Sequence, residues 1–183
     1  MRIVSGSAKG RPLKGPKGPG LRPTADRVRE TLFNVLGQYL EGGAVLDLYA
    51  GTGALAFEAL SRGAERAVLV DSGREALGLI RENAAALGFT AQAEVIAGDA
   101  LRTVLRLGKE GRRFSLVFAD PPYAKKAVAD LLTGIVGAGL LEEGGTVVLE
   151  HGKHEEVPAQ EGALVQVDQR AFGETRVTLY RVA

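Results

Sequence analysis

Apolar residues follow two different spacings along the chain. Short runs that are apolar almost throughout occupy residues 44–49, 66–71, 93–98, 114–119 and 146–151. Runs of this length without alternation are typical of strands buried on both faces of a parallel sheet. The segments between several of these runs instead carry apolar residues at helical spacing. Alternating strands and helices predict an α/β fold with helices on both faces of the sheet.

Start and stop signals place the predicted helices. Thr24 has the chemistry of an N-cap for a helix over about 25–40, which the Gly42-Gly43 pair ends. A second helix follows the glycine-rich residues 50–53 and runs to Arg62, where Gly63 stops it. Ser72 and Glu75 form a capping-box pattern for a third, which runs to about Leu87, and a fourth covers about 126–138.

The C-terminal residues have a different pattern. The segments 163–171 and 175–182 both have strand character, and only three residues join them. Three residues leave no room for a crossover helix, so these segments predict an antiparallel hairpin. The expected architecture is a doubly wound, mostly parallel, Rossmann-like sheet that ends in this hairpin.

The N-terminal residues carry much of the positive charge. Residues 1–30 hold eight basic and two acidic side chains, whereas residues 31–183 hold 15 basic and 20 acidic ones. The segments RIVSG and RPLKG could pair as a short hairpin, and the Gly- and Pro-rich stretch around them favours extended chain. A basic arm on an acidic body indicates a polyanionic partner, although a solvated terminus would give the same pattern.

Composition excludes several kinds of chemistry. The 183 residues include no cysteine, so disulfides, thiolate nucleophiles and iron–sulfur clusters are excluded. The two histidines, His151 and His154, are too few for a histidine-rich metal site and are expected at the surface or at a strand end. No apolar run reaches the roughly 18 residues of a membrane span, and no signal peptide is recognisable. We therefore expect a cytoplasmic protein that uses no metal.

The first candidate site is the glycine-rich turn after residues 44–49. Gly51 and Gly53 would let a ligand approach the backbone at a helix N-terminus. Asp71 ends the next strand, where an acid can accept hydrogen bonds from a ribose. The spacing also fits a dinucleotide site. Asp47 favours S-adenosylmethionine over a dinucleotide, because its charge would repel a pyrophosphate and attract a cationic amino-acid group. Alternatively, the Asp47 carboxylate only caps the turn. Asp99 would reach an adenine amino group.

The second candidate site is the sequence Asp120-Pro121-Pro122-Tyr123 after the fourth strand. Two prolines fix the backbone and remove two N–H donors, so the turn presents acceptors. An exocyclic amino group needs two acceptors and a stacking surface, which Asp120, the Pro121 carbonyl and the Tyr123 ring could supply. A plain strand-ending turn is the simpler reading. The turn follows the fourth strand of a fold with a glycine-rich cofactor loop, and this position favours a catalytic role for it.

Together these motifs resemble class I methyltransferases that act on amino groups. The run from Leu21 to Asn34, LRPTADRVRETLFN, further resembles the bacterial 16S rRNA guanine-N2 methyltransferases of the RsmD type. The resemblance extends from Arg2 to the C-terminal hairpin. It implies methyl transfer from S-adenosylmethionine to the N2 amine of a guanine in 16S rRNA. We expect a monomer that acts on 16S rRNA or a small ribosomal subunit particle, with a basic arm over 1–23 and a methyltransferase domain over 24–183.

The predicted site residues fall into three groups. The catalytic group is Asp120, Pro121, Pro122 and Tyr123. The cofactor-binding group is Asp47, Ala50, Gly51, Thr52, Gly53, Asp71, Ser72, Asp99, Ala100 and Asp120. The RNA-binding group is Lys9, Arg11, Lys14, Lys17, Arg22, Arg27 and Arg29. Arg112 and Arg113, before the fourth strand, are further candidates or solvated loop residues.

Three alternative functions remain compatible with the sequence. An adenine-N6 methyltransferase would use the same Asp-Pro-Pro-Tyr turn, because adenine also carries an exocyclic amine. A nicotinamide-dependent oxidoreductase would use the glycine-rich loop but not that turn. A non-catalytic rRNA-binding module would need neither, and an intact cofactor loop disfavours it.

Overall fold

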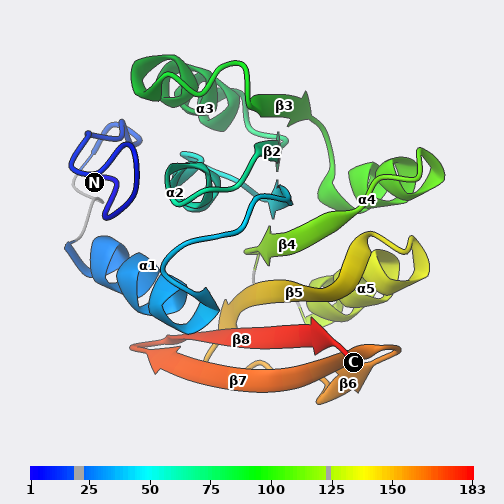
Figure 1. Ribbon diagram of the computed structural model, residues 1–183. Helices are drawn as coiled ribbons and strands as arrows, with labels where there is room; N and C mark the ends of the chain where they lie inside the picture. Colours follow the sequence, from blue (N-terminus) through cyan, green and yellow to red (C-terminus); the bar gives the residue numbers. More distant parts are fainter. Residues whose placement is uncertain (19–22, 123–124) are drawn as a thin grey trace. The chain divides into compact units, whose positions relative to one another are not determined.

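The computed structural model describes residues 1–18, 23–122 and 125–183. The chain forms two compact units, Met1–Ala97 and Gly98–Ala183. Each unit contains part of the alternating pattern of strands and helices (Figure 1).

Unit 1 is built on three parallel strands in the order β3-β2-β1. The strands are β1 (Ala44–Leu48), β2 (Arg66–Asp71) and β3 (Ala93–Ala97). Their register pairs Leu46 with Val68 and Leu69 with Val95. Four consecutive residues are buried in each of β1 and β2, as expected for strands covered on both faces. The helices of this unit are α1 (Pro23–Leu36), α2 (Ala54–Ser61) and α3 (Arg74–Leu87).

Unit 2 combines a parallel pair with an antiparallel extension. Strand β4 (Phe114–Ala119) runs parallel to β5 (Leu141–Gly152), and β8 (Thr175–Val182) lies antiparallel to β5. Strand β7 (Leu164–Phe172) pairs with β8, and the short β6 (Gln160–Glu161) pairs with β7. Helices α4 (Ala100–Lys109) and α5 (Lys125–Gly137) complete the unit.

The main elements predicted from the sequence are confirmed. Each of the five apolar runs contains a strand, and the C-terminal segments form the β7–β8 hairpin. Helices α2, α3 and α5 lie within one or two residues of their predicted bounds. The N-terminal hairpin is reduced to a single antiparallel bridge between Arg2 and Pro12.

Two predicted helix starts are wrong. Helix α1 begins at Pro23, so Thr24 lies inside the helix instead of capping it, and the helix ends at Leu36 before the left-handed Gly37. Helix α3 has Gly73 at its N-cap without a side-chain cap. The Gly73 N–H instead donates to Asp71, the preceding acid, at 2.8 Å. That bond replaces the predicted Ser72–Glu75 capping box.

Other elements were not predicted. Helix α4 fills the segment between β3 and β4, and its N-cap Asp99 accepts a hydrogen bond from the Arg102 N–H at 2.9 Å. Strand β5 begins at Leu141, five residues before the predicted apolar run. Its pairing with β4 shifts in register between Phe114 and Leu116, so the early part of β5 is irregular. The two-residue β6 is too short for a periodic signal.

The N-terminal arm is packed against α2. Ile3 and Leu13 are almost fully buried. The Ser7 N–H donates to the Ser61 carbonyl at 2.8 Å, and a Cβ on Gly6 would lie 1.8 Å from that carbonyl oxygen. Only a residue without a side chain allows this approach. The arm is therefore an integral part of unit 1, and a domain boundary after residue 23 stays a prediction.

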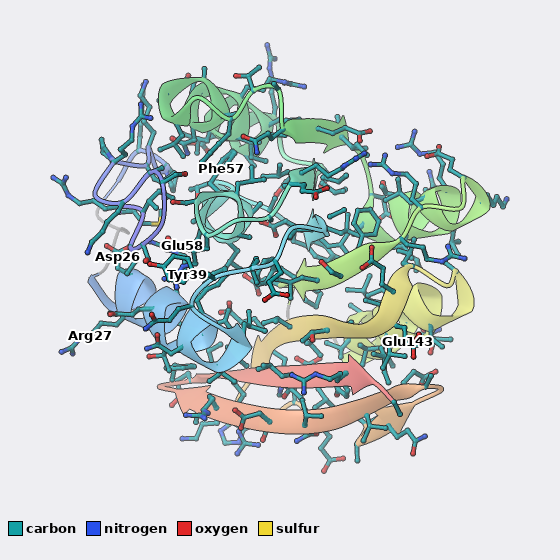
Figure 2. The ribbon with its side chains drawn as sticks, in the orientation of Figure 1. Asp26, Arg27, Tyr39, Phe57, Glu58 and Glu143 are labelled. Carbon is teal, nitrogen blue, oxygen red and sulfur yellow. The ribbon has the colours of Figure 1, made fainter. Side chains whose placement is uncertain are left out.

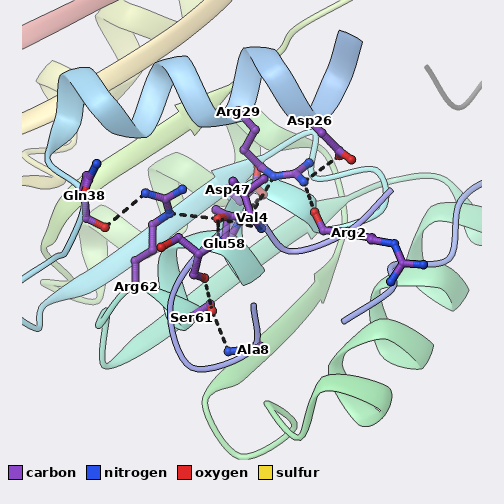
Figure 3. Close-up of polar contacts among 12 residues, drawn as sticks. Arg2, Val4, Ala8, Asp26, Arg29, Gln38, Asp47, Glu58, Ser61 and Arg62 are labelled. Carbon is purple, nitrogen blue, oxygen red and sulfur yellow. Dashed lines mark hydrogen bonds and ion pairs between the residues drawn. The ribbon is translucent and has the colours of Figure 1, made fainter. Parts of the chain in front are cut away.

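Glu58 on α2 holds the arm, α1 and α2 together (Figure 3). Its carboxylate has no solvent exposure and accepts hydrogen bonds from the backbone N–H groups of Val4 and Ser5. It also pairs with Arg29 at 3.0 Å and with Arg62 at 2.9 Å. Arg29 further donates to Asp26 and to the Arg2 carbonyl. Arg62 lies over the Phe33 ring, 4.6 Å from its centroid.

We expect Glu58→Gln to lower the free energy of unfolding by about 3–5 kcal/mol, because removing one partner of a buried pair leaves uncompensated charge. Urea unfolding measures the change. Glu82→Gln is the matched control, since Glu82 forms an exposed pair with Lys14 at 3.0 Å, and such pairs contribute less than about 1 kcal/mol. Equal effects of the two substitutions would contradict the proposed importance of Glu58.

Candidate active site

The glycine-rich turn between β1 and α2 is a left-handed backbone segment. Tyr49, Gly51 and Gly53 have φ values of 61°, 60° and 80°. A positive φ is unfavourable for tyrosine, and such strain concentrates at functional sites. The Ala50 N–H donates to the Val70 carbonyl at 3.0 Å, and the Gly53 N–H to the Ala50 carbonyl at 2.8 Å. These bonds hold the turn against the end of β2.

Asp71 ties this turn to the start of α3. One carboxylate oxygen accepts the Gly51 N–H at 2.9 Å, and the other accepts the Gly73 N–H at 2.8 Å. Because β1 and β2 are parallel, the turn and Asp71 meet at the same carboxyl edge of the unit 1 sheet. Ligands of open α/β sheets bind at that edge. The structure thus brings Gly51 and Asp71 together, while their binding of a cofactor stays a prediction. Ser72, which follows Asp71, is exposed.

The two glycines of the turn have different surroundings. A Cβ on Gly53 would lie 2.4 Å from the Phe57 ring, so Gly53 is required for packing at the start of α2. A Cβ on Gly51 would meet no atom of the described residues within 4 Å. The space beside the Gly51 backbone is therefore open on the side where a side chain would project.

Asp47 is buried beneath the turn. It is 3% exposed, and its carboxylate accepts the Ala56 N–H in the first turn of α2 at 3.2 Å. This contact matches the alternative interpretation of Asp47 as a capping carboxylate. Its predicted attraction of a cationic amino-acid group stays a prediction.

Asn83 is a positioning residue that the sequence analysis missed. It is 1% exposed on α3, and its side-chain amide donates to the carbonyls of Thr52 and Lys14 at 3.0 Å each. Its own oxygen accepts the Lys14 N–H at 2.8 Å. Asn83 therefore links the glycine-rich turn to the N-terminal arm. The available signal was a polar residue at a buried position of an otherwise apolar helix face.

In unit 2, Asp99 and Ala100 lie at the start of α4. The Asp99 carboxylate caps the helix through Arg102, and its backbone carbonyl accepts the Thr103 hydroxyl at 2.7 Å. Asp99 remains exposed, whereas Ala100 is 4% exposed. An exposed carboxylate can accept a hydrogen bond from a donor such as an adenine amino group, and this contact of Asp99 stays a prediction.

The Asp120-Pro-Pro turn follows β4 directly. Pro121 is buried, while Asp120 and Pro122 are exposed. Partial desolvation by the surrounding protein nevertheless raises the pKa of the Asp120 carboxyl above its ordinary value. The buried Pro121 anchors the turn and leaves the Asp120 carboxylate accessible. Tyr123 lies outside the described residues.

Glu150, near the end of β5, is a second carboxylate close to Asp120. The parallel register pairs Ala119 with Leu149, so Asp120 and Glu150 occupy the next position on adjacent strands. Burial, with the Asp120 charge as a smaller contribution, raises the pKa of Glu150 to about 7. The sequence analysis missed Glu150. Its only local signal was the presence of an acid near the end of the apolar run TVVLEH.

The predicted RNA-binding residues differ in accessibility. Lys9, Lys17 and Arg27 are exposed, and Figure 2 shows Arg27 extending away from α1. Arg11 donates to the carbonyls of Ala86 and Leu87 at the end of α3. Lys14 pairs with Glu82, as described above, and Arg22 lies outside the described residues.

Arg29 does not fit the predicted RNA surface. It is 3% exposed and is bound by Glu58 and Asp26. A phosphate could reach it only after the α1–α2 contact opened. We therefore correct that prediction and assign Arg29 to the buried ion network.

The histidines and the remaining acids show no grouping typical of a metal site. Within the described part of the chain, no three His, Asp or Glu side chains are placed to hold an ion. His154 is exposed, whereas His151 is buried in β5 with Nε2 2.7 Å from the Thr178 hydroxyl, and burial lowers its pKa. No helix among the described residues has the length and apolar character needed to span a membrane.

Comparison with known proteins places the chain in a family. Residues 1–181 match the family described as "Conserved hypothetical protein 95". The Bacillus subtilis protein YlbH is 41% identical over 181 residues, which cover 99% of this chain and 98% of YlbH. Ribosomal RNA small subunit methyltransferase D of Escherichia coli strain K12 is 33% identical over 99% of this chain and 89% of its own length.

A solved structure agrees with this relationship. The Escherichia coli methyltransferase-type protein yhhF shares the fold with a TM-score of 0.88 and 31% identity, and the likeness covers 100% of this chain and 97% of yhhF. The mixed α/β fold with its C-terminal hairpin is thus shared along the whole chain. These matches confirm the resemblance drawn from the glycine-rich turn, the Asp-Pro-Pro-Tyr motif and residues 21–34. The chain belongs to the conserved hypothetical protein 95 family, which contains RsmD-type methyltransferases.

Proposed function

We propose that this protein transfers a methyl group from S-adenosylmethionine to the exocyclic N2 amine of a guanine in 16S rRNA. The observation that carries the proposal is the Asp120-Pro121-Pro122 turn, which holds an accessible carboxylate on a rigid backbone after β4. A relative named for ribosomal RNA small subunit methylation, 33% identical over nearly the whole chain, supports the substrate class. We propose that a cytoplasmic monomer acts on free 16S rRNA or on a small-subunit particle.

The glycine-rich turn and Asp71 suit the cofactor. Open space over Gly51 leaves room for the ligand to approach the backbone, and Asp71 follows β2, where a ribose can be bound. When bound, S-adenosylmethionine supplies an electrophilic methyl group on a sulfonium. Because Asp71 also holds the turn through Gly51, its substitution affects both the contact and the shape of the site.

Asp120 and Pro121 would activate the target amine. The lone pair of a guanine amine is delocalised into the ring, which makes the amine a poor nucleophile. Hydrogen bonds from its two protons to the Asp120 carboxylate and the Pro121 carbonyl would orient that lone pair toward the methyl group. Tyr123 would stack on the extruded base. This part of the chemistry is positioning and electrostatic stabilisation.

Glu150 would remove the proton that Asp120 accepts. The new N–C bond would form as the bond between sulfur and the methyl group breaks, which would leave a neutral thioether and a positive charge on the amine nitrogen. One amine proton would then pass to the Asp120 carboxylate. Asp120 and Glu150 lie beside one another on adjacent strands, so the proton can move on to an ionised Glu150 and then to water. A pKa of about 7 makes Glu150 a suitable acceptor near neutral pH.

Two other functions make different predictions. An adenine-N6 methyltransferase would use the same acceptors, and a non-catalytic rRNA-binding module would bind RNA without turnover. Mass mapping of methylated nucleotides in rRNA from a deletion strain, with and without the restored gene, distinguishes all three. Loss of one N2-methylguanine is the expected result, loss of an N6-methyladenine supports the first alternative, and no change supports the second.

We expect Asp71→Ala to weaken binding of S-adenosylhomocysteine about ten- to a hundredfold, because the substitution removes charged hydrogen bonds worth about 1.5–3 kcal/mol. Isothermal titration calorimetry measures the change. The control is Glu75→Ala, which removes an exposed acid from the first turn of α3. Unchanged affinity in a folded Asp71→Ala protein would remove Asp71 from the cofactor site.

We expect Asp120→Ala to slow methyl transfer about a hundredfold or more while RNA affinity stays near normal, because phosphate contacts dominate that affinity. Tyr123→Ala should weaken base binding as well, by about 1–3 kcal/mol for one lost stack. Tyr123→Phe should be mild, since stacking needs only the ring. Single-turnover methylation of rRNA measures all three. A wild-type rate for Asp120→Ala would rule out the proposed role of Asp120.

Ionisation of Glu150 should make the methylation rate depend on pH. If Glu150 must be ionised, the single-turnover rate of the wild type rises as pH increases through about 7. Glu150→Gln should be slower above that pH and should lose this inflection. A purely structural Glu150 would leave the inflection in place.

Stability gives an independent check on the same carboxyl group. Its pKa is raised on folding, so the stability it contributes is present below about 4.5 and is lost as pH rises through about 7. Glu150→Gln should therefore be less sensitive to pH over that range in urea unfolding. A parallel pH dependence in both proteins would contradict the raised pKa.

A further inference from the structure

Helix α4 presents two opposite faces within unit 2. Its buried face consists of Ala100, Thr103, Val104 and Leu107. Two close approaches hold that face against α5 and the residues after it. A Cβ on Gly108 would lie 2.6 Å from the Ala138 Cβ, and one on Gly134 would lie 2.6 Å from the Leu101 side chain. The orientation of α4 about its own axis is therefore determined by packing.

The opposite face carries a stripe of cations. Arg102, Arg106 and Lys109 are spaced by four and three residues, which places them on one side of an α-helix. Arg113 follows Lys109 by four more residues, just beyond the helix. All four side chains belong to exposed residues. At about 1.5 Å per residue, the part of the stripe on the helix is about 10 Å long.

Few acids neutralise this stripe. Residues 100–113 contain five basic side chains and one acidic one, Glu110, whereas the rest of residues 31–183 contains 10 basic and 19 acidic ones. Glu110 contacts Arg106 only at 4.0 Å, and both side chains are about half exposed. An exposed pair of this kind is weak. Residues 100–113 therefore carry a net positive charge, whereas the rest of residues 31–183 carries a net negative charge.

We propose that the exposed face of α4, formed by Arg102, Arg106, Lys109 and Arg113, binds the phosphate backbone of the RNA substrate. The proposal rests on the proposed function for the identity of the polyanion. It is supported by the arrangement of the cations, because exposed side chains can replace the counterions of a phosphate chain at little cost, and the exposed Arg106–Glu110 pair is weak. Arg29 on α1, one of the predicted RNA-binding residues, lacks this freedom because it is buried and paired with Glu58 and Asp26. The face of α4 would therefore add phosphate contacts to those of the arm.

The test is the triple substitution Arg102→Gln/Arg106→Gln/Lys109→Gln, with binding to poly(U) and to a 16S rRNA transcript measured over a range of salt concentrations. Each lost phosphate contact lowers the log–log salt slope by about 0.7 on a single strand, so we expect a reduction of about 2. The matched control is Arg66→Gln/Arg81→Gln/Arg181→Gln, which removes the same charge from exposed positions elsewhere. The salt slope of the control variant should change by less than half as much as that of the α4 triple variant.

A single substitution keeps the test informative if the triple variant folds poorly. Glu110→Gln removes the one acid of the segment, so it should tighten poly(U) binding and steepen the salt dependence. The proposal is overturned if the α4 and control triple variants lose equal slope, or if Glu110→Gln has no effect. Preferential loss of binding to anionic vesicles, with RNA binding intact, would overturn it in favour of a membrane surface.

Failure of this inference can be told apart from failure of the proposed function. Binding of S-adenosylhomocysteine should be unchanged in the α4 triple variant, and saturating rRNA at low salt should restore most of its methylation rate. Methylation by the wild type with equal slopes for both triple variants would refute only the α4 surface. Absence of methylation by the wild type would refute the proposed function.

Discussion

The Glu58 carboxylate is an interaction on which most of unit 1 depends. It lies without solvent exposure between two arginines and two backbone N–H groups, which come from the arm, α1 and α2. A buried charge of this kind is tolerated only when all its partners are in place. The arm, α1 and α2 must therefore dock together. Since α2 begins directly after the glycine-rich turn, the same interaction fixes one end of the candidate cofactor site.

The turn itself is held from several sides by protein groups. Asp71 accepts from Gly51, Asn83 donates to the Thr52 carbonyl, and Gly53 packs against Phe57. These contacts between protein groups surround Tyr49 and the two glycines, which are in left-handed conformations. A preformed site of this kind loses little conformational entropy when it binds a cofactor.

Charge in unit 2 is divided between two distinct features. The carboxylates of Asp120 and Glu150 stand at the ends of parallel strands, where burial raises the pKa of each above its ordinary value and the Asp120 charge raises that of Glu150 further. The exposed cations of α4 point away from the packed face of that helix. Proton transfer needs a desolvated pair, whereas phosphate binding needs accessible charge, so the two tasks require opposite environments.

The sequence by itself determined the strands, the C-terminal hairpin and the two motifs, because these depend on local spacing and on turn residues close in the chain. It did not determine which polar groups meet. Arg29 does not bind RNA in the way its charge predicts, because it is paired with Glu58, which lies 29 residues further along the chain. Likewise, Glu150 gains its raised pKa only when β5 pairs with β4 beside Asp120. Burial and pairing between distant segments are properties of the tertiary structure, since they arise only when those segments pack.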